Sequence, residues 1–401
     1  MKFSNRIDRI AGKGSQAWKV HRDALEMRQQ GRDVILLAVG DPDQRTPEVL
    51  IEGAIDALRA GETGYAPILG FDDVRDAIAA RFASTTGRPC HRSNVSVVPG
   101  AQAGLFCALQ CLVEEGDEVI VPEPTYATYE GVLGAAGGKM VNVPLRPERG
   151  FHPDIETIAA AITPRTRAIW INSPHNPTGA VMSGDEVAAI CKLCTEHDLW
   201  LISDEVYETL AFSARHVSPW SLPDMSERTV VISSLSKSHA APGMRFGWVI
   251  GPPELTTHMA NLILCMFYGA PRFIQRAAFA ALTNEPSLVA EMKKVYARRA
   301  VLMTDILSTA PRCRASSPEA GMFVMLDVRG TGMDGDTFAE KLLLQQEVAV
   351  LSCEGFGPSA SGHLRISLTA PDELLEKAAR RIVAFSTSIS VPEGAAGTTS
   401  L

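Results

Sequence analysis

Lys237 lies in a sequence context that favours a reactive amine. It follows the apolar run Val230–Ile232 and a stretch of small hydroxyl residues, and Arg245 lies eight positions later. A buried ammonium is costly unless a partner or a pKa shift relieves it. A desolvated lysine is what Schiff-base formation with an aldehyde cofactor requires. Ser234 and Arg245 would then hold a nearby anion, such as a phosphate group. Taken alone, Lys237 also fits a surface lysine in a polar loop.

A second candidate anion site follows the apolar run at residues 95–98. Ligands of open α/β sheets bind at the carboxyl ends of the strands. The next residues are Gly100, Ala101 and Gln102, in a small-residue turn that opens a helix. Free N–H groups and the positive end of a helix dipole favour a phosphate there. Such turns are also common where no anion binds.

Four further polar residues follow other predicted strands. Tyr126 could stack on a planar ring or simply pack, and Asn176, in an Asn-Pro-Thr-Gly turn, offers an amide to a cofactor hydroxyl. Asp204 ends an apolar strand, where a carboxylate needs a partner. The protonated ring nitrogen of pyridoxal phosphate is such a partner, because the pair makes the ring a better electron sink. Tyr207 could reach the phenolic oxygen of the same ring.

These motifs together resemble the ordered motif set of class I pyridoxal-phosphate aminotransferases, which have fold type I. The matching motifs are Pro-Gly-Ala-Gln at 99–102, Asn-Pro-Thr-Gly at 176–179, Asp-Glu-Val-Tyr at 204–207, and Ser-x-Ser-Lys with a later Gly-x-Arg-x-Gly at 234–247. Their order and intervals agree from Gly40 to Arg365. Each short motif is weak alone, but the lysine motif is fairly specific and the set is strong.

The resemblance implies a role for each matching residue. Lys237, Asp204 and Tyr207 are implied as catalytic. The implied ligands of pyridoxal 5′-phosphate are Lys237, Gly100, Ala101, Gln102, Tyr126, Asn176, Asp204, Tyr207, Ser234, Ser236, Arg245 and Tyr65. Gly40, Asn176 and Arg365 are implied to bind substrate, with Arg365 gripping the α-carboxylate. Tyr65 is implied to reach the site of a partner subunit, so a homodimer is expected.

The chain departs from this family at two points. Gly100 and Ala101 stand where relatives often carry a hydroxyl residue, so backbone N–H groups and Ser234 must do more there. The second cationic residue of the acidic-substrate members has no identifiable counterpart.

Stretches outside the cofactor motifs narrow the resemblance to a bacterial subgroup, the arginine–pyruvate aminotransferases. They include Gly-Met-Phe-Val-Met at 321–325 and Gly-Phe-Gly-Pro-Ser-Ala at 355–360. The implied reaction moves the α-amino group of an L-amino acid, such as arginine or another basic amino acid, to a 2-oxo acid such as pyruvate. Asp41, Asp43 and Glu62 could face a guanidinium, but nothing in the sequence separates them from cap or surface charges.

Two other functions fit part of the pattern. A β-eliminating C–S lyase would keep the same cofactor residues. A pyridoxal-phosphate-sensing regulator would carry a basic winged-helix module ahead of this region, whereas here the region begins within the first 40 residues and the chain is acidic.

Composition limits the partners and the compartment. The 401 residues are 46% apolar and 21% charged with a net charge of −8, which argues against a nucleic-acid or membrane-surface binder. No apolar segment has the length of a signal or a membrane span. The eight cysteines follow no secreted framework, and Cys191 and Cys194 share one helix face, which favours reduced core thiols over a metal site. We therefore expect a cytoplasmic protein with no metal ion.

Short apolar strands alternating with helices predict an α/β fold. A large domain with a mostly parallel seven-stranded sheet flanked by helices is expected at 46–285. A smaller α+β domain is expected from 1–45 and 286–386, followed by a flexible tail at 387–401. The strands predicted for the sheet are Val95–Val98, Glu118–Val121, Met140–Val143, Arg167–Asn172, Trp200–Ser203, Thr229–Ser233 and Phe246–Ile250. The strands predicted for the smaller domain are Val34–Val39, Met322–Val328, Val348–Leu351 and His363–Leu368.

Overall fold

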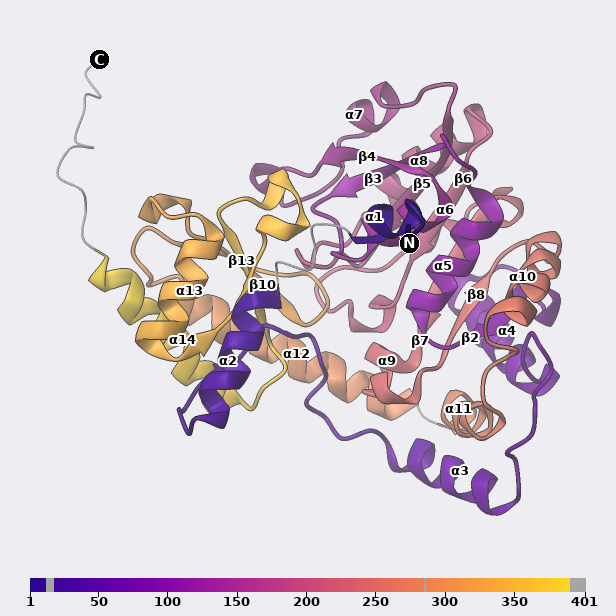
Figure 1. Cartoon of the computed structure of the whole chain (residues 1–401), viewed down its shortest axis with the longest axis horizontal. Coiled ribbons are helices and arrows are strands. Elements are labelled where there is room, and N and C mark those ends of the chain that lie inside the picture. The colour runs from indigo at the N-terminus through magenta and orange to yellow at the C-terminus, as the bar shows by residue number, and fades with distance from the viewer. Residues whose placement is uncertain (12–17, 285, 390–401) are drawn as a thin grey trace.

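A seven-stranded sheet is the largest element of the computed structural model, which describes residues 1–11, 18–284 and 286–389. The strand order is β2-β8-β7-β6-β5-β3-β4 (Figure 1). All neighbours are parallel except β8, which is antiparallel to β2 and β7. The strands are β2 (Val95–Val98), β3 (Glu118–Glu123), β4 (Lys139–Pro144), β5 (Thr166–Asn172), β6 (Trp200–Asp204), β7 (Thr229–Ser234) and β8 (Gly247–Ile250). The predicted mostly parallel sheet is confirmed.

Helices cover both faces of this sheet. In β5, Ala168 and Trp170 pack in one apolar cluster with α5 (Ala101–Leu112) and α6 (Tyr129–Ala136). Ile169 and Ile171 point the other way and pack with α8 (Gly184–Glu196). Successive strand residues face opposite sides, so a strand buried on both faces reads as a continuous apolar run. The further helices of this part are α3 (Glu48–Arg59), α4 (Asp72–Thr86), α7 (Ile155–Ala160), α9 (Leu235–Ser238), α10 (Pro253–Met266) and α11 (Arg272–Asn284).

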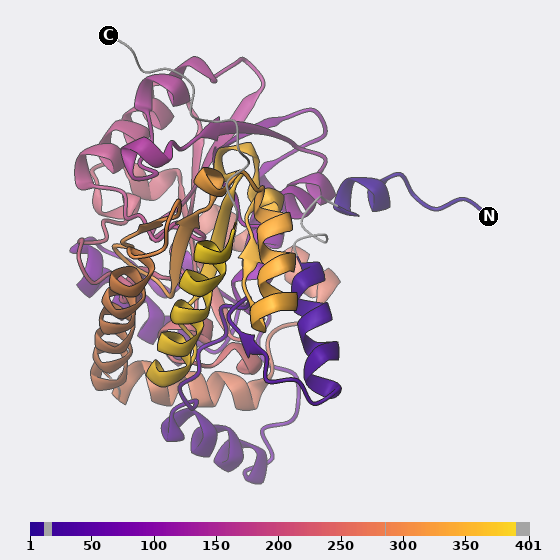
Figure 2. The same cartoon turned by 90° about the vertical axis from the view of Figure 1, so that its left-hand side faces the viewer.

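A four-stranded antiparallel sheet forms the second, smaller part, in the order β12-β13-β10-β9. Its strands are β9 (Arg314–Ser316), β10 (Phe323–Asp327), β12 (Leu351–Ser352) and β13 (His363–Ser367), and its helices are α2 (Lys19–Gln29), α12 (Pro286–Leu307), α13 (Gly335–Gln346) and α14 (Asp372–Ser388). The N-terminal α2 lies beside α13, as both Figure 1 and Figure 2 show, so the two ends of the chain build this α+β part together.

The buried face of α14 illustrates why this part holds together. Its buried apolar residues recur at helical spacing, as Leu375, Ala378, Ala379, Ile382 and Phe385. Such a stripe packs one side of a helix against a core. Phe385 meets Phe338 of α13 edge to face, with ring centroids 4.9 Å apart. The helix α1 (Arg6–Ala11) differs, because it has no buried residue.

Several predicted bounds were wrong. The apolar run Val34–Val39 contributes only β1 (Ile35–Leu36), which pairs with β11 (Val348–Ala349). The predicted strand Val348–Leu351 is split, because Leu351 belongs to β12 and pairs with β13 instead. Helix α14 continues to Ser388, beyond the start of the predicted tail. Residues 390–401 of that tail lie outside the described residues.

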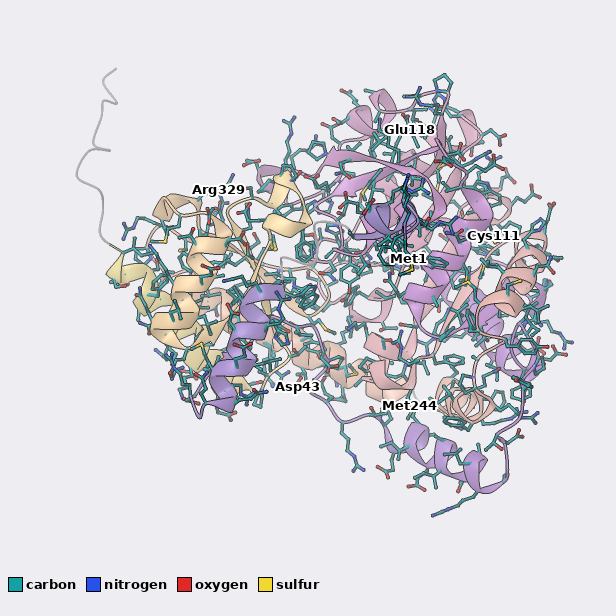
Figure 3. All side chains as sticks on the ribbon, viewed as in Figure 1. Met1, Asp43, Cys111, Glu118, Met244 and Arg329 are labelled. Carbon is teal, nitrogen blue, oxygen red and sulfur yellow. The ribbon has the colours of Figure 1, made fainter. Side chains whose placement is uncertain are left out.

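An arginine of α12 ties the segment after β1 to the smaller part. Arg299 donates to both carboxylate oxygens of Asp43, at 2.8 and 2.9 Å, and to Asp372 at 3.0 Å. Asp43, labelled in Figure 3, lies on the segment that leads from β1 to α3. Bidentate arginine–carboxylate pairs fix geometry as well as charge. This pairing anchors the chain close to Gly40.

None of the described helices combines the length and apolar character that a membrane crossing requires. All eight cysteines lie in the described part of the chain and all are free thiols. Cys191 and Cys194 are buried in α8, and burial raises the pKa of the Cys191 thiol to about 12. Their predicted place in the core is confirmed.

Candidate active site

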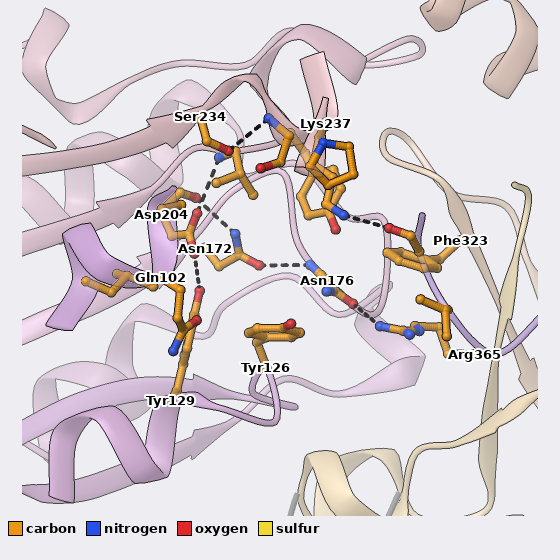
Figure 4. Close-up of a pocket in the computed structure, with 18 of the residues that line it drawn as sticks. Gln102, Tyr126, Tyr129, Asn172, Asn176, Asp204, Ser234, Lys237, Phe323 and Arg365 are labelled. Atoms are coloured by element: carbon orange, nitrogen blue, oxygen red, sulfur yellow. Dashed lines mark hydrogen bonds between the residues drawn. The ribbon is translucent and has the colours of Figure 1, made fainter. Parts of the chain in front are cut away.

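A cavity of about 260 Å³ lies at the carboxyl ends of β5, β6 and β7, with Arg365 and Phe323 of the smaller part on its other side (Figure 4). Most of the predicted site residues line it. They are Gly40, Ala101, Gln102, Tyr126, Asn176, Asp204, Tyr207, Ser234, Ser236, Lys237, Arg245 and Arg365. Gly100 caps α5 next to Ala101. Tyr65 alone lies elsewhere.

Lys237 enters the cavity from α9, the short helix that follows β7. The side chain of Ser234 caps this helix by accepting a bond from the Ser236 N–H at 3.3 Å. The Nζ of Lys237 donates to the Gly40 carbonyl oxygen at 2.6 Å. Burial lowers the pKa of Lys237 to about 8, although the nearby Asp41 opposes the shift. An amine with this pKa is about one-tenth neutral at pH 7, which an ordinary lysine is not.

Asp204 ends β6 as a buried carboxylate. Its Oδ2 accepts a hydrogen bond from the Tyr129 hydroxyl at 2.7 Å, and its Oδ1 accepts one from the Val206 N–H at 3.3 Å. Burial raises the pKa of Asp204 to about 6, while these two bonds act in the opposite direction. No cationic side chain pairs with Asp204 among the described residues. A buried carboxylate of this kind suits a ligand that brings a positive charge.

The turn before α5 suits an anion. Helix α5 begins at Ala101, and the Gly104 N–H is the first to bond back to Gly100, so the earlier N–H groups are available. Arg245 is held over this turn by bonds to Pro99 and Pro242 carbonyl oxygens at 3.0 and 2.9 Å.

Two glycines make this close arrangement possible. Gly100 has φ of 85°, which favours glycine, and a Cβ there would lie 2.9 Å from Cζ of Arg245. A Cβ on Gly247 would lie 2.8 Å from the Gly100 carbonyl carbon. Side chains at either position would push the turn, β8 and the guanidinium apart.

Arg365 reaches the cavity from β13 and is buried. Its two terminal nitrogens donate to Asn176 Oδ1 at 3.0 Å and to the Ala38 carbonyl at 2.9 Å, while its Nε has no partner within the described chain. The guanidinium lies over the Phe323 ring, 4.1 Å from the centroid. Asn176 is itself fixed, because its N–H donates to Asn172 Oδ1 at 2.9 Å. A preorganised guanidinium is a carboxylate receptor.

Tyrosines line the remaining wall. Tyr126 meets Tyr129 edge to face at 5.8 Å, and Tyr129 stacks on Trp170 with centroids 3.9 Å apart. Burial raises the pKa of Tyr207 far above its ordinary value, so its hydroxyl stays protonated and able to donate. The tyrosines of this wall therefore combine apolar ring faces with polar hydroxyl groups.

Tyr65 does not join the pocket of its own chain. It is 79% exposed and packs against Tyr268, with ring centroids 4.9 Å apart. Its predicted position in a partner's site stays a prediction.

Several lining residues were not predicted: Trp18, Val39, Leu105, Tyr129, Asn172, Val206, Pro242 and Phe323. Asn172 could have been found, because it is the last residue of a predicted strand. Tyr129 follows Tyr126 by three positions and begins α6. Phe323 lies in the 321–325 stretch, which indicates the subgroup but no place in the site, and nothing in the sequence marks Trp18. Both reach the cavity through packing between distant segments.

A two-part α/β fold is typical of the fold type I aminotransferase class when it holds a half-buried lysine after one strand, a buried aspartate at the end of the neighbouring strand, and an anion-binding turn with an arginine over it. The family model described as aminotransferase class I and II matches residues 32–382. The chain belongs to this family and is an aminotransferase.

Individual relatives agree along nearly the whole chain. The arginine–pyruvate transaminase AruH of Pseudomonas aeruginosa is 48% identical over 382 residues, covering 95% of this chain and 97% of that protein. The aspartate/prephenate aminotransferase of Thermus thermophilus is 37% identical, covering 92% and 96%. The solved structure of the Thermus thermophilus aspartate aminotransferase with maleate superposes with a TM-score of 0.91 at 36% identity, covering 96% of this chain and 100% of that one.

Proposed function

We propose that the pocket binds pyridoxal 5′-phosphate and that the chain uses it to move the α-amino group of an L-amino acid to a 2-oxo acid. The residues that line the pocket support this cofactor. They offer an amine for the aldehyde, a buried carboxylate for a protonated ring nitrogen, and a helix N-terminus with an arginine for the phosphate. When bound, pyridoxal phosphate supplies a conjugated ring that withdraws electrons from the substrate α-carbon. The observation that carries the proposal is that Lys237, Asp204 and the start of α5 line one cavity.

Three residues do the chemical work in this proposal. Lys237 would hold the cofactor through its amine and, with that amine free, would take a proton from the substrate α-carbon and return one, acting as base and acid. Its lowered pKa suits this role, since part of the amine is neutral at pH 7. Asp204 would keep the ring nitrogen protonated, and Tyr207 would donate to the ring oxygen together with Asn176.

The other predicted residues orient the two ligands. Gly100, Ala101, Gln102, Ser234, Ser236 and Arg245 would bind the phosphate, and Tyr126 would stack on the ring. Arg365 would bind the substrate α-carboxylate with Asn176 beside it. Gly40 would bring its backbone close to the substrate, and the position favours glycine because a Cβ there would lie 2.8 Å from Cε1 of Phe323.

The direct test replaces Lys237. Lys237→Ala should lower kcat by at least about 10³-fold, because it removes the base, while pyridoxal phosphate still binds through its phosphate and ring contacts. Lys293→Ala is the matched control, since Lys293 is exposed on α12. Undiminished transamination by Lys237→Ala would refute the proposal.

We propose arginine, or another basic amino acid, as the amino donor and pyruvate as an acceptor. The 48%-identical arginine–pyruvate transaminase supports this choice. Of the three acidic candidates, Asp43 is paired with Arg299 and Glu62 with Arg272. Asp41 is exposed, has no ion pair within the described chain and lies close enough to influence the charge of Lys237. Asp41 is therefore our candidate for the residue that pairs with the positive charge at the end of the substrate side chain.

The Asp41 assignment is tested by the ratio of the KM values for two substrates, arginine and alanine. Asp41→Asn should raise KM for arginine about 2- to 5-fold relative to KM for alanine, as an exposed ion pair would. Taking the ratio removes any effect of Asp41 on Lys237, because both substrates use the same amine. An unchanged ratio would contradict the assignment.

We also propose the assembly and the domain division that the sequence indicates. The large domain is 46–285, the smaller one combines 1–45 with 286–386, and the enzyme is a homodimer in which Tyr65 binds the phosphate in the neighbouring site. The exposure of Tyr65 supports this role, because its side chain is accessible to another chain. A Tyr65→Phe enzyme that binds the cofactor as tightly as the parent would contradict it. The free thiols support a cytoplasmic location.

A further inference from the structure

The Asp204 carboxylate has a side-chain neighbour that belongs to none of the recognised motifs. The Tyr129 hydroxyl lies 2.7 Å from Asp204 Oδ2 and donates to it (Figure 4). Among the residues that the structure describes, no other side chain donates to this carboxylate. Its other contact is the Val206 N–H, at the longer distance of 3.3 Å.

Tyr129 is fixed by its aromatic neighbours. It is the first residue of α6, it is 2% exposed, and its ring lies almost parallel to that of Trp170, at 25°. Tyr126 packs edge to face against the Tyr129 ring, with an interplanar angle of 80°. Buried stacked rings have few alternative rotamers. The hydroxyl is therefore aimed at Asp204 before any ligand arrives.

The Tyr129 hydroxyl can act only as a donor to this carboxylate. Burial, followed by the charge of Asp204, raises the pKa of Tyr129 well above its ordinary value, so the proton stays on the tyrosine. A donor of this kind favours the ionised form of its acceptor. It opposes the burial that raises the pKa of Asp204.

A separate contact holds the backbone of Asp204. The Asn172 side chain donates to the Asp204 carbonyl oxygen at 2.9 Å, not to the carboxylate. Removing the Tyr129 hydroxyl would thus leave the strand end in place and change only the charge and orientation of the carboxylate.

We propose that Tyr129 is a positioning residue, which keeps Asp204 ionised and directs its carboxylate toward the cofactor ring nitrogen. The proposal rests on the proposed binding of pyridoxal phosphate. It assigns to a residue of α6 part of the electron-withdrawing power of the site, exerted through Asp204.

The test measures the affinity of the cofactor-free enzyme for pyridoxal phosphate, over a range of pH. Tyr129→Phe keeps the ring on Trp170 and removes one oxygen. It should weaken binding roughly 10-fold, as expected for a bond to a charged group. The pH below which affinity declines should also move upward, because Asp204 is protonated more easily without its donor.

Two comparisons separate this role from packing. Tyr296→Phe removes another buried tyrosine hydroxyl, which donates to Gln44 at 2.9 Å, and should leave affinity and its pH profile unchanged. In an Asp204→Asn background, Tyr129→Phe should cost less than about threefold, since the charge on which it acts is gone. Thermal melts check that each variant is folded.

An equal loss of affinity in the parent and Asp204→Asn backgrounds, or no loss in either, would overturn the inference. A parent enzyme that fails to bind pyridoxal phosphate would overturn the proposed function as well, so the two failures are distinguishable.

Discussion

The two ends of the pocket are built in different ways. Lys237, Asp204 and the turn before α5 all lie at the ends of strands of one sheet, so the end of the pocket proposed to bind the cofactor, here called the cofactor end, is carried by a single scaffold. Arg365 and Phe323 come from the other sheet, and Gly40 from the segment after β1, so the end proposed to bind substrate, here called the substrate end, depends on contacts between the two parts. Sites on one scaffold are held more firmly than sites shared between two.

Arg365 shows what this sharing implies. Its guanidinium is fixed by Asn176 of the large part and by the Ala38 carbonyl of the N-terminal segment. A movement of one part relative to the other would therefore alter the carboxylate receptor before it altered Lys237 or Asp204. We expect damage at the cofactor end to reduce both cofactor affinity and turnover, and damage at the substrate end to reduce substrate binding alone.

The largest effect is expected at the cofactor end. Asp204→Asn removes the charge that stabilises a protonated ring nitrogen and should lower kcat about 10²- to 10³-fold, as loss of a preorganised electrostatic contact does. Affinity for pyridoxal phosphate should fall in parallel. Steady-state kinetics and cofactor titration measure the two quantities. A kcat within threefold of the parent would remove Asp204 from the mechanism.

A somewhat smaller effect is expected at the substrate end. Arg365→Lys keeps a positive charge but loses the planar fork, and it leaves either Asn176 Oδ1 or the Ala38 carbonyl without its donor. KM for amino acids should rise roughly 10²-fold, with cofactor affinity unchanged. An equal loss of cofactor affinity would show that the two ends are not separable.

The smallest expected effect is a change in the pKa of Lys237, on which Asp41 acts through its charge. The rate at which the cofactor-free enzyme captures pyridoxal phosphate should rise with pH through an inflection near pH 8 and level off about one pH unit higher, because the neutral amine is the reacting form and burial lowers the pKa of Lys237 to about 8. Asp41 raises that pKa, so Asp41→Asn should move the inflection to lower pH. Stopped-flow absorbance follows the capture. An inflection near the ordinary lysine value would contradict the burial of Lys237.

The same contrast explains which residues the sequence could predict. Each cofactor-end residue follows its own apolar run, and parallel strands bring their carboxyl ends to one edge, so order along the chain is enough. Phe323 and Trp18 could not be predicted, because only the packing of the two parts brings them to the cavity. Tyr129 was missed for a related reason: its bond to Asp204 depends on how α6 lies on the sheet.

The fold follows the same division. The strands of the large sheet are buried on both faces, and their apolar runs predicted them closely. The run Val34–Val39 is also apolar, but only Ile35–Leu36 form a strand, since the Leu37 carbonyl accepts the N–H of Ser367 from β13. The apolar character of this run determines that it is buried, but the hydrogen bonds to neighbouring strands determine which of its residues form a strand.

The central claim is that this pocket performs transamination with a basic amino donor. The most direct measurement loads the enzyme with pyridoxal phosphate, adds one amino acid at a time without any 2-oxo acid, and follows the absorbance of the bound cofactor together with the products. Arginine should convert the cofactor once, with one equivalent of 2-oxo acid per chain and no ammonia. Continuous release of a 2-oxo acid and ammonia, or no response to arginine and lysine, would contradict the account.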